Sequence, residues 1–457
     1  MKGHKKGLSF YLLTLGCPKN SVDSEAIVEL LTEAGYRVSP RPARADYVMV
    51  NTCGFLEAAK AESIQALRKL AARKRPQQRL IAVGCLAQRL GIELARQVSE
   101  LDGLIGTHHW PDIVSCLEEL ADGQGPNTAP LTRLEGSASC PPECLPLRRD
   151  RLGRRATAYL KIADGCSASC AFCTIPTFKG PARSRPRQLI LNEAQALVEQ
   201  GTRELILVAQ DIMAYGRDWG ETDALPALIE DILRVAPQLH WLRLMYAYPN
   251  YTSRRLIEVM ASHARICRYL DMPLQHGHPA TLRRMGRPHQ VDKTLRWIEA
   301  LRAAMPDIAL RTTFIVGYPG ETPAEFQGLL DFMQTVQFDR VGIFTYSREP
   351  GTPAYDLPRQ VPEEVKQERY QAAMQLQQGI SLARNQAQVG RQLDVLIDGV
   401  GDGISLARSY RDAPEIDGFV ILQEERQAGE FVPVRVVRAT PYDLMAVPVH
   451  SAAGSQT

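Results

Sequence analysis

The sequence predicts an α/β protein of three domains: a doubly wound parallel sheet, then a partial barrel of about six strand–helix units, then a small all-β barrel. Three observations predict this. The chain has 457 residues, enough for about three domains of typical size. Apolar runs of strand length alternate with amphipathic helical stretches over most of the chain. From about residue 391, short apolar segments follow one another with Gly and Asp between them.

The first domain is expected over residues 7–120. Its strands are the apolar runs 8–15, 47–50 and 80–83, and a helix over 22–34 separates the first two. Lysines before residue 8 also give this N-terminus the form of a short secretory signal. We favour a buried first strand, because the pattern of a strand followed by a cysteine recurs twice downstream. The protein is then expected in the cytoplasm, where cysteines stay reduced.

A linker rich in Gly and Pro is expected over 121–151, a central domain over 152–383 and the terminal barrel over 384–452. The central strands are expected at 158–162, 204–208, 241–245, 269–272, 311–316 and 340–345. A long polar helix over 362–388 leads to the last domain, whose apolar segments are 393–397, 419–422 and 431–437. Active-site loops of such barrels lie at the carboxyl ends of the strands.

Composition excludes several classes of protein. Hydrophobic residues make up 45% of the chain and charged residues 23%, as in ordinary globular proteins. No apolar run approaches the roughly 18 residues that a membrane-spanning helix needs, so we expect no membrane partner. The formal net charge of +3 gives no sign of a chain that binds nucleic acid by bulk charge.

The strongest local signal follows the first central strand, where Cys166, Cys170 and Cys173 lie within eight residues. Three thiolates without a fourth nearby suit an iron–sulfur cluster that keeps one iron free of protein ligands. Zinc is the alternative, but structural zinc sites have a fourth ligand and paired spacings. Three incidental buried cysteines would be the other alternative.

A second set consists of Cys17, Cys53 and Cys85, each directly after one of the first three strands. The carboxyl ends of parallel strands meet at one edge of a sheet, so these thiols are expected to converge there. The alternative is that cysteine fills tight strand-to-loop turns. Cys140 and Cys144 lie in the linker, as a redox pair, a zinc half-site or incidental residues.

The C-x-x-x-C-x-x-C spacing after the first barrel strand resembles the radical S-adenosylmethionine superfamily. The segment from Arg311 to Glu321 resembles the fifth-strand segment that contacts the nucleoside in that superfamily. The resemblance implies that the free iron chelates S-adenosylmethionine, whose reductive cleavage gives a deoxyadenosyl radical. Residues expected to bind S-adenosylmethionine are Gln210, Asp211, Gln275, Arg311 and Gly317.

Together, the spread cysteines, the radical core and the terminal barrel resemble the methylthiotransferase family. The segments Gly16-Cys17-Pro18-Lys19-Asn20 and Asn51-Thr52-Cys53-Gly54-Phe55 resemble its RimO branch, which modifies an aspartate of ribosomal protein S-twelve. The resemblance implies a TRAM domain at the C-terminus and a second 4Fe–4S cluster on Cys17, Cys53 and Cys85 that delivers sulfur. S-adenosylmethionine is then both radical source and methyl donor.

The implied partners are ribosomal protein S-twelve or the small ribosomal subunit, a low-potential electron donor such as flavodoxin or ferredoxin, and a sulfur source. We expect a monomer. A tRNA methylthiotransferase acting on isopentenyl-adenosine is one alternative, and a non-enzymatic iron–sulfur carrier or scaffold is another.

Charge favours a protein substrate. From residue 391 onward the chain has six arginines and no lysine against ten acidic residues, a formal charge of −4. A barrel that grips RNA should be basic, whereas an acidic barrel suits a basic ribosomal protein. Asp412, Glu415 and Asp417, clustered in one loop, are the residues expected to contact it.

Overall fold

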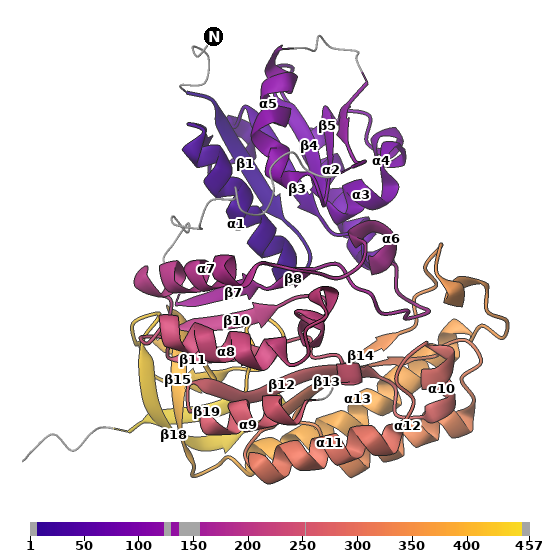
Figure 1. The fold of residues 1–457 in the computed structure, drawn as a ribbon, viewed down its shortest axis with the longest axis vertical. Helices are drawn as coiled ribbons and strands as arrows, with labels where there is room; N and C mark the ends of the chain where they lie inside the picture. The colour runs from indigo at the N-terminus through magenta and orange to yellow at the C-terminus, as the bar shows by residue number, and fades with distance from the viewer. Residues whose placement is uncertain (1–6, 123–128, 137–155, 252, 450–457) are drawn as a thin grey trace, which may run out of the picture.

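The computed structural model describes residues 7–122, 129–136, 156–251 and 253–449. Figure 1 shows the first domain at the top, the central domain below it, and the terminal barrel in yellow against the central domain. Cys140 and Cys144, with most of the expected linker, lie outside the described residues.

The first domain is a doubly wound sheet of six parallel strands in the order β2-β1-β3-β4-β5-β6, as predicted. Helices α1 and α5 pack on one face, around Ile27 and Leu117. Helices α2, α3 and α4 pack on the other, around Leu67 and Leu94. The elements are β1 (Ser9–Thr14), α1 (Pro18–Glu33), β2 (Arg37–Val38), η1 (Pro42–Arg44), β3 (Tyr47–Thr52), α2 (Glu57–Ala71), β4 (Arg79–Gly84), α3 (Cys85–Leu90), α4 (Ile92–Gln97), β5 (Gly103–Gly106), η2 (Trp110–Asp112), α5 (Ile113–Asp122) and β6 (Leu131–Arg133).

The central domain is an open sheet of six parallel strands in sequential order, β7-β10-β11-β12-β13-β14, which confirms the predicted partial barrel. Leu205 and Leu207 of β10 join the core under the helices, while Ile206 and Val208 point to the opposite face. The strands of the central sheet are β7 (Thr157–Lys161), β10 (Glu204–Val208), β11 (Trp241–Leu244), β12 (Ile266–Gln275), β13 (Ala309–Val316) and β14 (Arg340–Thr345). Strands β8 (Ala163–Asp164) and β9 (Arg183–Ser184) form a separate two-stranded sheet. The helices are α6 (Ile175–Lys179), α7 (Arg187–Glu199), η4 (Ile212–Ala214), η5 (Arg217–Trp219), α8 (Ala224–Val235), η6 (Pro249–Tyr251), α9 (Arg254–Ser262), α10 (Pro279–Arg284), α11 (Val291–Ala304), α12 (Pro323–Val336), η7 (Pro353–Asp356) and α13 (Glu363–Gln386).

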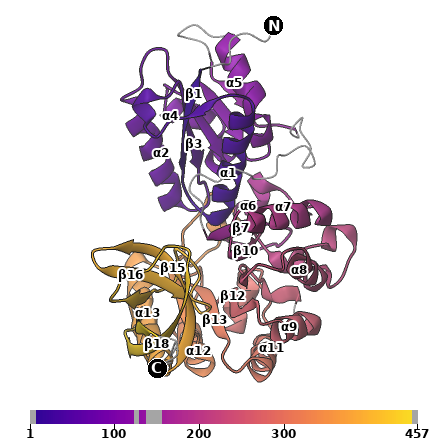
Figure 2. The ribbon, with the colours of Figure 1, turned by 90° about the vertical axis from the view of Figure 1, so that its left-hand side faces the viewer.

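The C-terminal domain is a closed barrel in the order β15-β16-β17-β19-β18. Its strands are β15 (Gln392–Gly401), β16 (Ile404–Ser409), β17 (Val420–Leu422), β18 (Phe431–Ala439) and β19 (Leu444–Pro448). Leu396 and Ala413 of this domain pack against Ile206 and Trp241 of the central sheet. The barrel therefore covers the face of that sheet that the helices leave open, and Figure 2 shows it beside the central strands.

The first domain sits on the carboxyl ends of the central strands. Helix α1 contacts β7, and Lys161 at the end of β7 forms an ion pair with Asp23 of α1. Because α1 itself follows β1, the carboxyl edges of the two parallel sheets face each other. Among the described residues, no helix is both long enough and apolar enough to span a bilayer.

Candidate functional site

The structure brings Cys17, Cys53 and Cys85 together at the carboxyl edge of the first sheet. Cys17 caps α1, Cys53 follows β3 and Cys85 begins α3. A Cβ added to Gly16 would lie 2.9 Å from Cys53 Sγ, so a glycine is needed where these two turns meet. Gly54 packs closely against the turn at Cys85, since a Cβ added to Gly54 would lie 3.1 Å from the carbonyl carbon of Cys85.

Side chains from α1 and β3 hold the three strand ends in register. Asn20 donates to the carbonyl oxygens of Leu15 (2.9 Å) and Thr52 (3.2 Å). Asn51 donates to the carbonyl oxygen of Asn20 at 2.9 Å, and Thr52 Oγ1 donates to that of Val83 at 2.7 Å. The three cysteine turns are thus fixed by buried hydrogen bonds rather than by contacts among the thiols.

The second triad lies in the loop after β7. Backbone N–H groups face two of its thiols, from Ala168 to Cys166 Sγ and from Ile175 to Cys173 Sγ, each at 3.4 Å. The Arg287 guanidinium donates to Cys170 Sγ at 3.5 Å. These donors all favour sulfur that carries negative charge.

Burial acts against ionisation of two thiols in each triad. It raises the pKa of Cys53, and it raises the pKa of Cys85 to about 12. It also raises the pKa of Cys166, and that of Cys173 to about 12. Thiolates at these positions therefore need more positive charge than Lys179 and Arg287 supply nearby.

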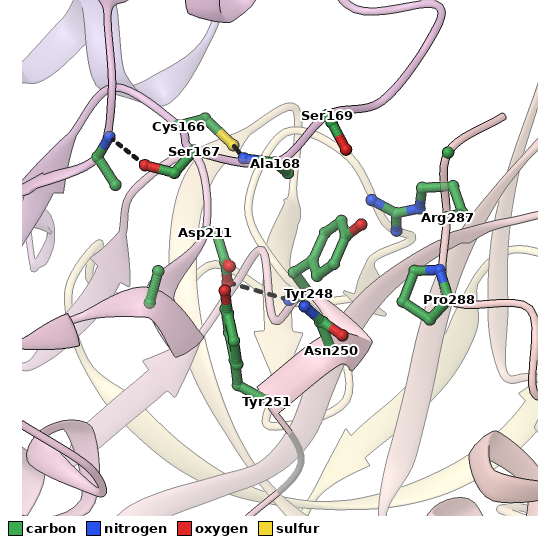
Figure 3. A pocket seen from close by; sticks show the side chains of 13 residues that line it. Cys166, Ser167, Ala168, Ser169, Asp211, Tyr248, Asn250, Tyr251, Arg287 and Pro288 are labelled. Atoms are coloured by element: carbon green, nitrogen blue, oxygen red, sulfur yellow. Dashed lines mark hydrogen bonds between the residues drawn. The ribbon is translucent and has the colours of Figure 1, made fainter. Parts of the chain in front are cut away.

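A pocket of about 310 Å³ opens beside the second triad, as Figure 3 shows. Cys166 lies on its wall, and the Arg287 guanidinium stacks on the Tyr248 ring at another part of the wall. The pocket is lined by Cys166, Ser167, Ala168, Ser169, Ala182, Asp211, Ala214, Tyr248, Asn250, Tyr251, Gly286, Arg287 and Pro288. Polar and apolar groups alternate on this wall, which suits a ligand with both a charged end and flat rings.

Asp211 is the charged acceptor of this pocket. Its Oδ1 accepts from the backbone N–H groups of Met213 (2.9 Å) and Tyr248 (3.3 Å). Burial nevertheless raises the pKa of this carboxyl to about 6. Asp211 is thus held in place and poorly compensated, as expected of a group that receives a cation or a strong donor from a ligand.

The other residues expected to bind S-adenosylmethionine are not among the residues that line this pocket. Gln275 ends β12 with a φ of 74°, and the buried Oε1 of Gln210 has no hydrogen-bond partner in the described chain. The Arg311 guanidinium forms ion pairs with Asp271 (2.8 Å) and Asp417 (3.4 Å). Arg311 therefore lies at the junction with the terminal barrel, and its contact with S-adenosylmethionine stays a prediction.

Gly317 lies at another contact. With a φ of 72°, it sits under Lys366 of α13, whose Cγ would be 2.3 Å from an added Cβ. Glycine is needed there for the close approach of α13. This packing explains the residue without a ligand.

The acidic loop of the terminal barrel differs from the expectation as well. Asp412 is 1% exposed and forms an ion pair with Arg340 at 2.7 Å. The side chain of Asp417 is 2% exposed and accepts from the Tyr269 hydroxyl at 2.8 Å. Only Glu415 is exposed. The expectation that all three contact a substrate is therefore wrong for Asp412 and Asp417, which neutralise buried arginines.

Sequence reasoning missed the ionic groups between the domains. Asp23, Asp164, Lys161 and Lys179 form a buried cluster between the first and central domains, with Lys179 and Asp164 3.1 Å apart. No spacing in the sequence links these residues. Arg287 and Tyr248 were missed for the same reason, since only the fold brings them to the cysteine loop.

Both triads suit an iron–sulfur cluster by the chemistry of their donors. Each offers three soft sulfur ligands in a desolvated place, and the second has an open pocket next to Cys166. No group of three or more His, Cys, Asp or Glu side chains in the described ranges is arranged to hold a single metal ion. In a 4Fe–4S cluster each thiolate binds a different iron, so the thiols need not surround one point.

Three family matches cover the three domains. Residues 9–106 match Uncharacterized protein family UPF0004, residues 160–333 match the Radical SAM superfamily, and residues 389–449 match the TRAM domain.

Relatives resemble the chain along nearly its whole length. A protein of Chloroflexus aurantiacus named "Ribosomal protein uS12 methylthiotransferase RimO" is 52% identical, over 96% of this chain and 99% of its own. Proteins of the same name from Roseiflexus sp. and Desulforamulus reducens are 49% and 44% identical. The matches cover 96% of this chain in both, and 96% and 98% of the relatives.

Solved structures support the fold. The radical S-adenosylmethionine methyltransferase TsrM from Kitasatospora setae, with cobalamin and a [4Fe-4S] cluster bound, has a TM-score of 0.55 at 14% identity. That match covers 87% of this chain and 80% of TsrM. The same enzyme with tryptophan and a SAM analogue has a TM-score of 0.57 at 13% identity, over 84% and 90% of the two chains.

Proposed function

Since the chain belongs to the family of ribosomal protein uS12 methylthiotransferases named RimO, we propose that it attaches a methylthio group to the β-carbon of an aspartate of this ribosomal protein. It is a radical S-adenosylmethionine enzyme, as its central domain and its relatives indicate. The substrate is the protein uS12, the S-twelve of the small subunit. The alternatives of a tRNA substrate or an iron–sulfur carrier have no comparable support.

The observation that carries the proposal is the pairing of the two cysteine triads across facing sheet edges. Cys166, Cys170 and Cys173 would hold one 4Fe–4S cluster, and Cys17, Cys53 and Cys85 a second. When bound, the cluster on Cys166, Cys170 and Cys173 together with S-adenosylmethionine supplies a radical that removes hydrogen from carbon, and the cluster on Cys17, Cys53 and Cys85 supplies sulfur. Both triads lie at carboxyl edges that face each other at the junction of the first and central domains.

The residues that line the pocket beside Cys166 would bind and orient S-adenosylmethionine. The pocket beside Cys166 would take S-adenosylmethionine, with Asp211 accepting hydrogen bonds from N–H or O–H groups of this ligand. Tyr248 and the Arg287 guanidinium, 3.8 Å above its ring, form the opposite wall. The terminal barrel closes the inner face of the central sheet and so helps to exclude water from the junction.

The partners in this proposal are uS12, free or within the small subunit, a low-potential electron donor such as flavodoxin or ferredoxin, and a sulfur source. We propose that the enzyme acts as a monomer in the cytoplasm, where ribosomal proteins are available to it.

The proposal is tested by incubating the anaerobically reconstituted protein with S-adenosylmethionine, a reductant and sulfide, and with either purified uS12 or bulk tRNA. Mass spectrometry should find a methylthio group on one aspartate of uS12 and none on tRNA. Modified tRNA with unmodified uS12 would contradict the proposal.

A further inference from the structure

Lys19 is a buried cation that lacks a carboxylate partner. The residue is 8% exposed. Among the described residues, the groups that favour its charged form are the Tyr246 and Cys17 side chains, and no carboxylate is among them. Its Nζ instead lies 3.5 Å from the centre of the Tyr246 ring. A buried ammonium without a counter-charge is costly, so it is kept only where something compensates it.

Other buried lysines at the same junction are paired. Lys161 forms ion pairs with Asp23 and Asp164, and Lys179 lies 3.1 Å from Asp164. Lys60, on the same domain as Lys19, has Glu349 at 3.1 Å. Lys19 differs from these neighbours because its ammonium has the Cys17 thiol and the Tyr246 side chain beside it and, among the described residues, no carboxylate.

The position of Lys19 is where the proposed reaction takes place. It lies two residues after Cys17, on the first turn of α1. Tyr246, against which it packs, lies two residues after the end of β11, at the carboxyl edge of the central sheet. The Lys19 ammonium thus lies between the edge of the first sheet, which holds Cys17, and the central sheet, whose first loop holds Cys166.

Tyr246 is fixed rather than free to move away. Its φ of 65° is uncommon for a residue with a side chain, and such conformations persist where the surroundings impose them. Its backbone N–H donates to Asp271 Oδ2 at 3.1 Å, and Asp271 is paired with Arg311. The aromatic wall beside Lys19 is therefore anchored in the buried ion network that reaches the terminal barrel.

We propose that Lys19 binds the carboxylate of the substrate aspartate and so selects this side chain. This inference rests on the proposed function, because an aspartate substrate is what brings a carboxylate to the junction. One charge-assisted hydrogen bond from Lys19 would fix the carboxylate and leave the neighbouring β-carbon facing the space between the triads. An asparagine in the same place would offer no charge.

The test compares two synthetic peptides, one that spans the modified aspartate of uS12 and one with asparagine at that position. For the parent protein we expect tighter binding and a higher kcat/KM with the aspartate peptide, by about 100-fold. In Lys19→Met, which keeps the length of the side chain, this preference should fall below about tenfold. Lys19→Arg should restore most of it.

Kd is measured by fluorescence anisotropy and kcat/KM by mass spectrometry. Each ratio compares two peptides on one preparation, so a change in cluster loading cancels out. Lys69→Met on the exposed end of α2 is the matched control and should keep the parent ratio. Lys19→Gln serves the same purpose if Lys19→Met does not fold.

An unchanged aspartate preference in Lys19→Met or Lys19→Gln would overturn the assignment of Lys19. If the parent neither binds nor modifies the aspartate peptide or intact uS12, the proposed function fails, and the inference fails with it. These two failures are distinguishable because the first requires an active parent.

Discussion

At the scale of single residues, the six triad cysteines carry the chemistry, and their surroundings explain why. Backbone N–H groups and Arg287 face the triad of Cys166, Cys170 and Cys173, yet burial raises the pKa of Cys173 to about 12. In the other triad, burial raises the pKa of Cys85 to about 12. Neighbouring desolvated thiols do not ionise together unless a metal centre takes their charge. The triads are thus prepared for metal and poorly suited to act as free thiols.

The first prediction concerns iron. The reconstituted parent should hold about eight irons, four for each 4Fe–4S cluster. Replacing Cys166, Cys170 and Cys173 together by Ala should leave about four and abolish cleavage of S-adenosylmethionine. Iron analysis and assay of deoxyadenosine measure both. Cys116→Ala, a change at a buried cysteine of α5, is the control. Unchanged iron in the triple variant would refute the ligand assignment.

The second prediction separates the triads by function. Cys17→Ala, Cys53→Ala or Cys85→Ala should leave deoxyadenosine formation measurable and stop the formation of the carbon–sulfur bond. The reason is that these thiols belong to another domain than the pocket beside Cys166. If any of these variants methylthiolates uS12 at the parent level, the triad of Cys17, Cys53 and Cys85 does not deliver sulfur.

Single residues also show what sequence can and cannot predict. Cys166, Cys170 and Cys173 lie in one short loop, so their spacing reveals a shared site. Cys17, Cys53 and Cys85 could be grouped because each follows a strand. Asp412 and Asp417 were misread, since an acidic loop looks the same in sequence whether it faces solvent or buried arginines such as Arg340 and Arg311.

At the scale of elements, the joint between the central sheet and the terminal barrel is ionic as well as apolar. Glu204 at the start of β10 is fully buried between Arg243 of β11 (2.7 Å) and Arg408 of β16 (2.8 Å). Burial opposes the ionisation of Glu204, but the two guanidiniums outweigh it and lower its pKa to about 2. The Glu204 carboxylate thereby links two strands of the central sheet to β16 of the barrel.

The third prediction follows from this pairing. Glu204→Gln leaves the buried Arg243 guanidinium without its carboxylate partner, while Arg408 keeps Asp398. The change should destabilise the protein by about 3–5 kcal/mol at pH 7, as measured by urea unfolding. Glu368→Gln, on the exposed side of α13, should change little.

The pH dependence gives an independent check. Glu204 has a folded pKa of about 2 against an ordinary value of 4.5. Its ionised form therefore adds about 3 kcal/mol of stability above pH 4.5, which is lost as the pH falls towards 2. The difference between parent and Glu204→Gln should shrink over this range. A difference independent of pH would mean that the carboxylate charge does not stabilise the joint.

Element boundaries followed the sequence closely where periodicity was strong. Strands β10 and β14 have the predicted limits. Strand β16 was missed because it continues β15 through the Gly401-Asp402-Gly403 turn and reads as part of a loop. Strand β6 lies in a segment expected to be linker, since three residues with Thr and Arg carry too little periodicity to reveal an edge strand.

At the scale of the whole molecule, three domains enclose one junction. The first domain faces the carboxyl ends of the central strands, and the barrel covers the inner face of the same sheet. This packing was not predictable, because residues such as Arg243, buried at 0% exposure in a strand, take their partners from distant parts of the chain. The domain order was predictable, because each domain has its own periodicity.

The fourth prediction concerns how a basic protein substrate approaches. Glu415 is the exposed member of the acidic loop, and Glu415→Lys should slow the association of uS12 several-fold at low salt. The effect should shrink as salt screens the charge. Stopped-flow association, with Glu368→Lys as the control, measures it. Equal rates for both variants at every salt concentration would show that this loop does not guide the substrate.

The most direct measurement is mass spectrometry of uS12 from cells that lack this protein, complemented either with the parent gene or with its Cys166→Ala variant. We predict that one aspartate of uS12 carries a methylthio group with the parent and is unmodified with Cys166→Ala, while methylthio nucleosides in tRNA stay constant. Modification of uS12 in cells without the protein, or a loss of tRNA methylthiolation instead, would contradict the assignment of this enzyme to uS12.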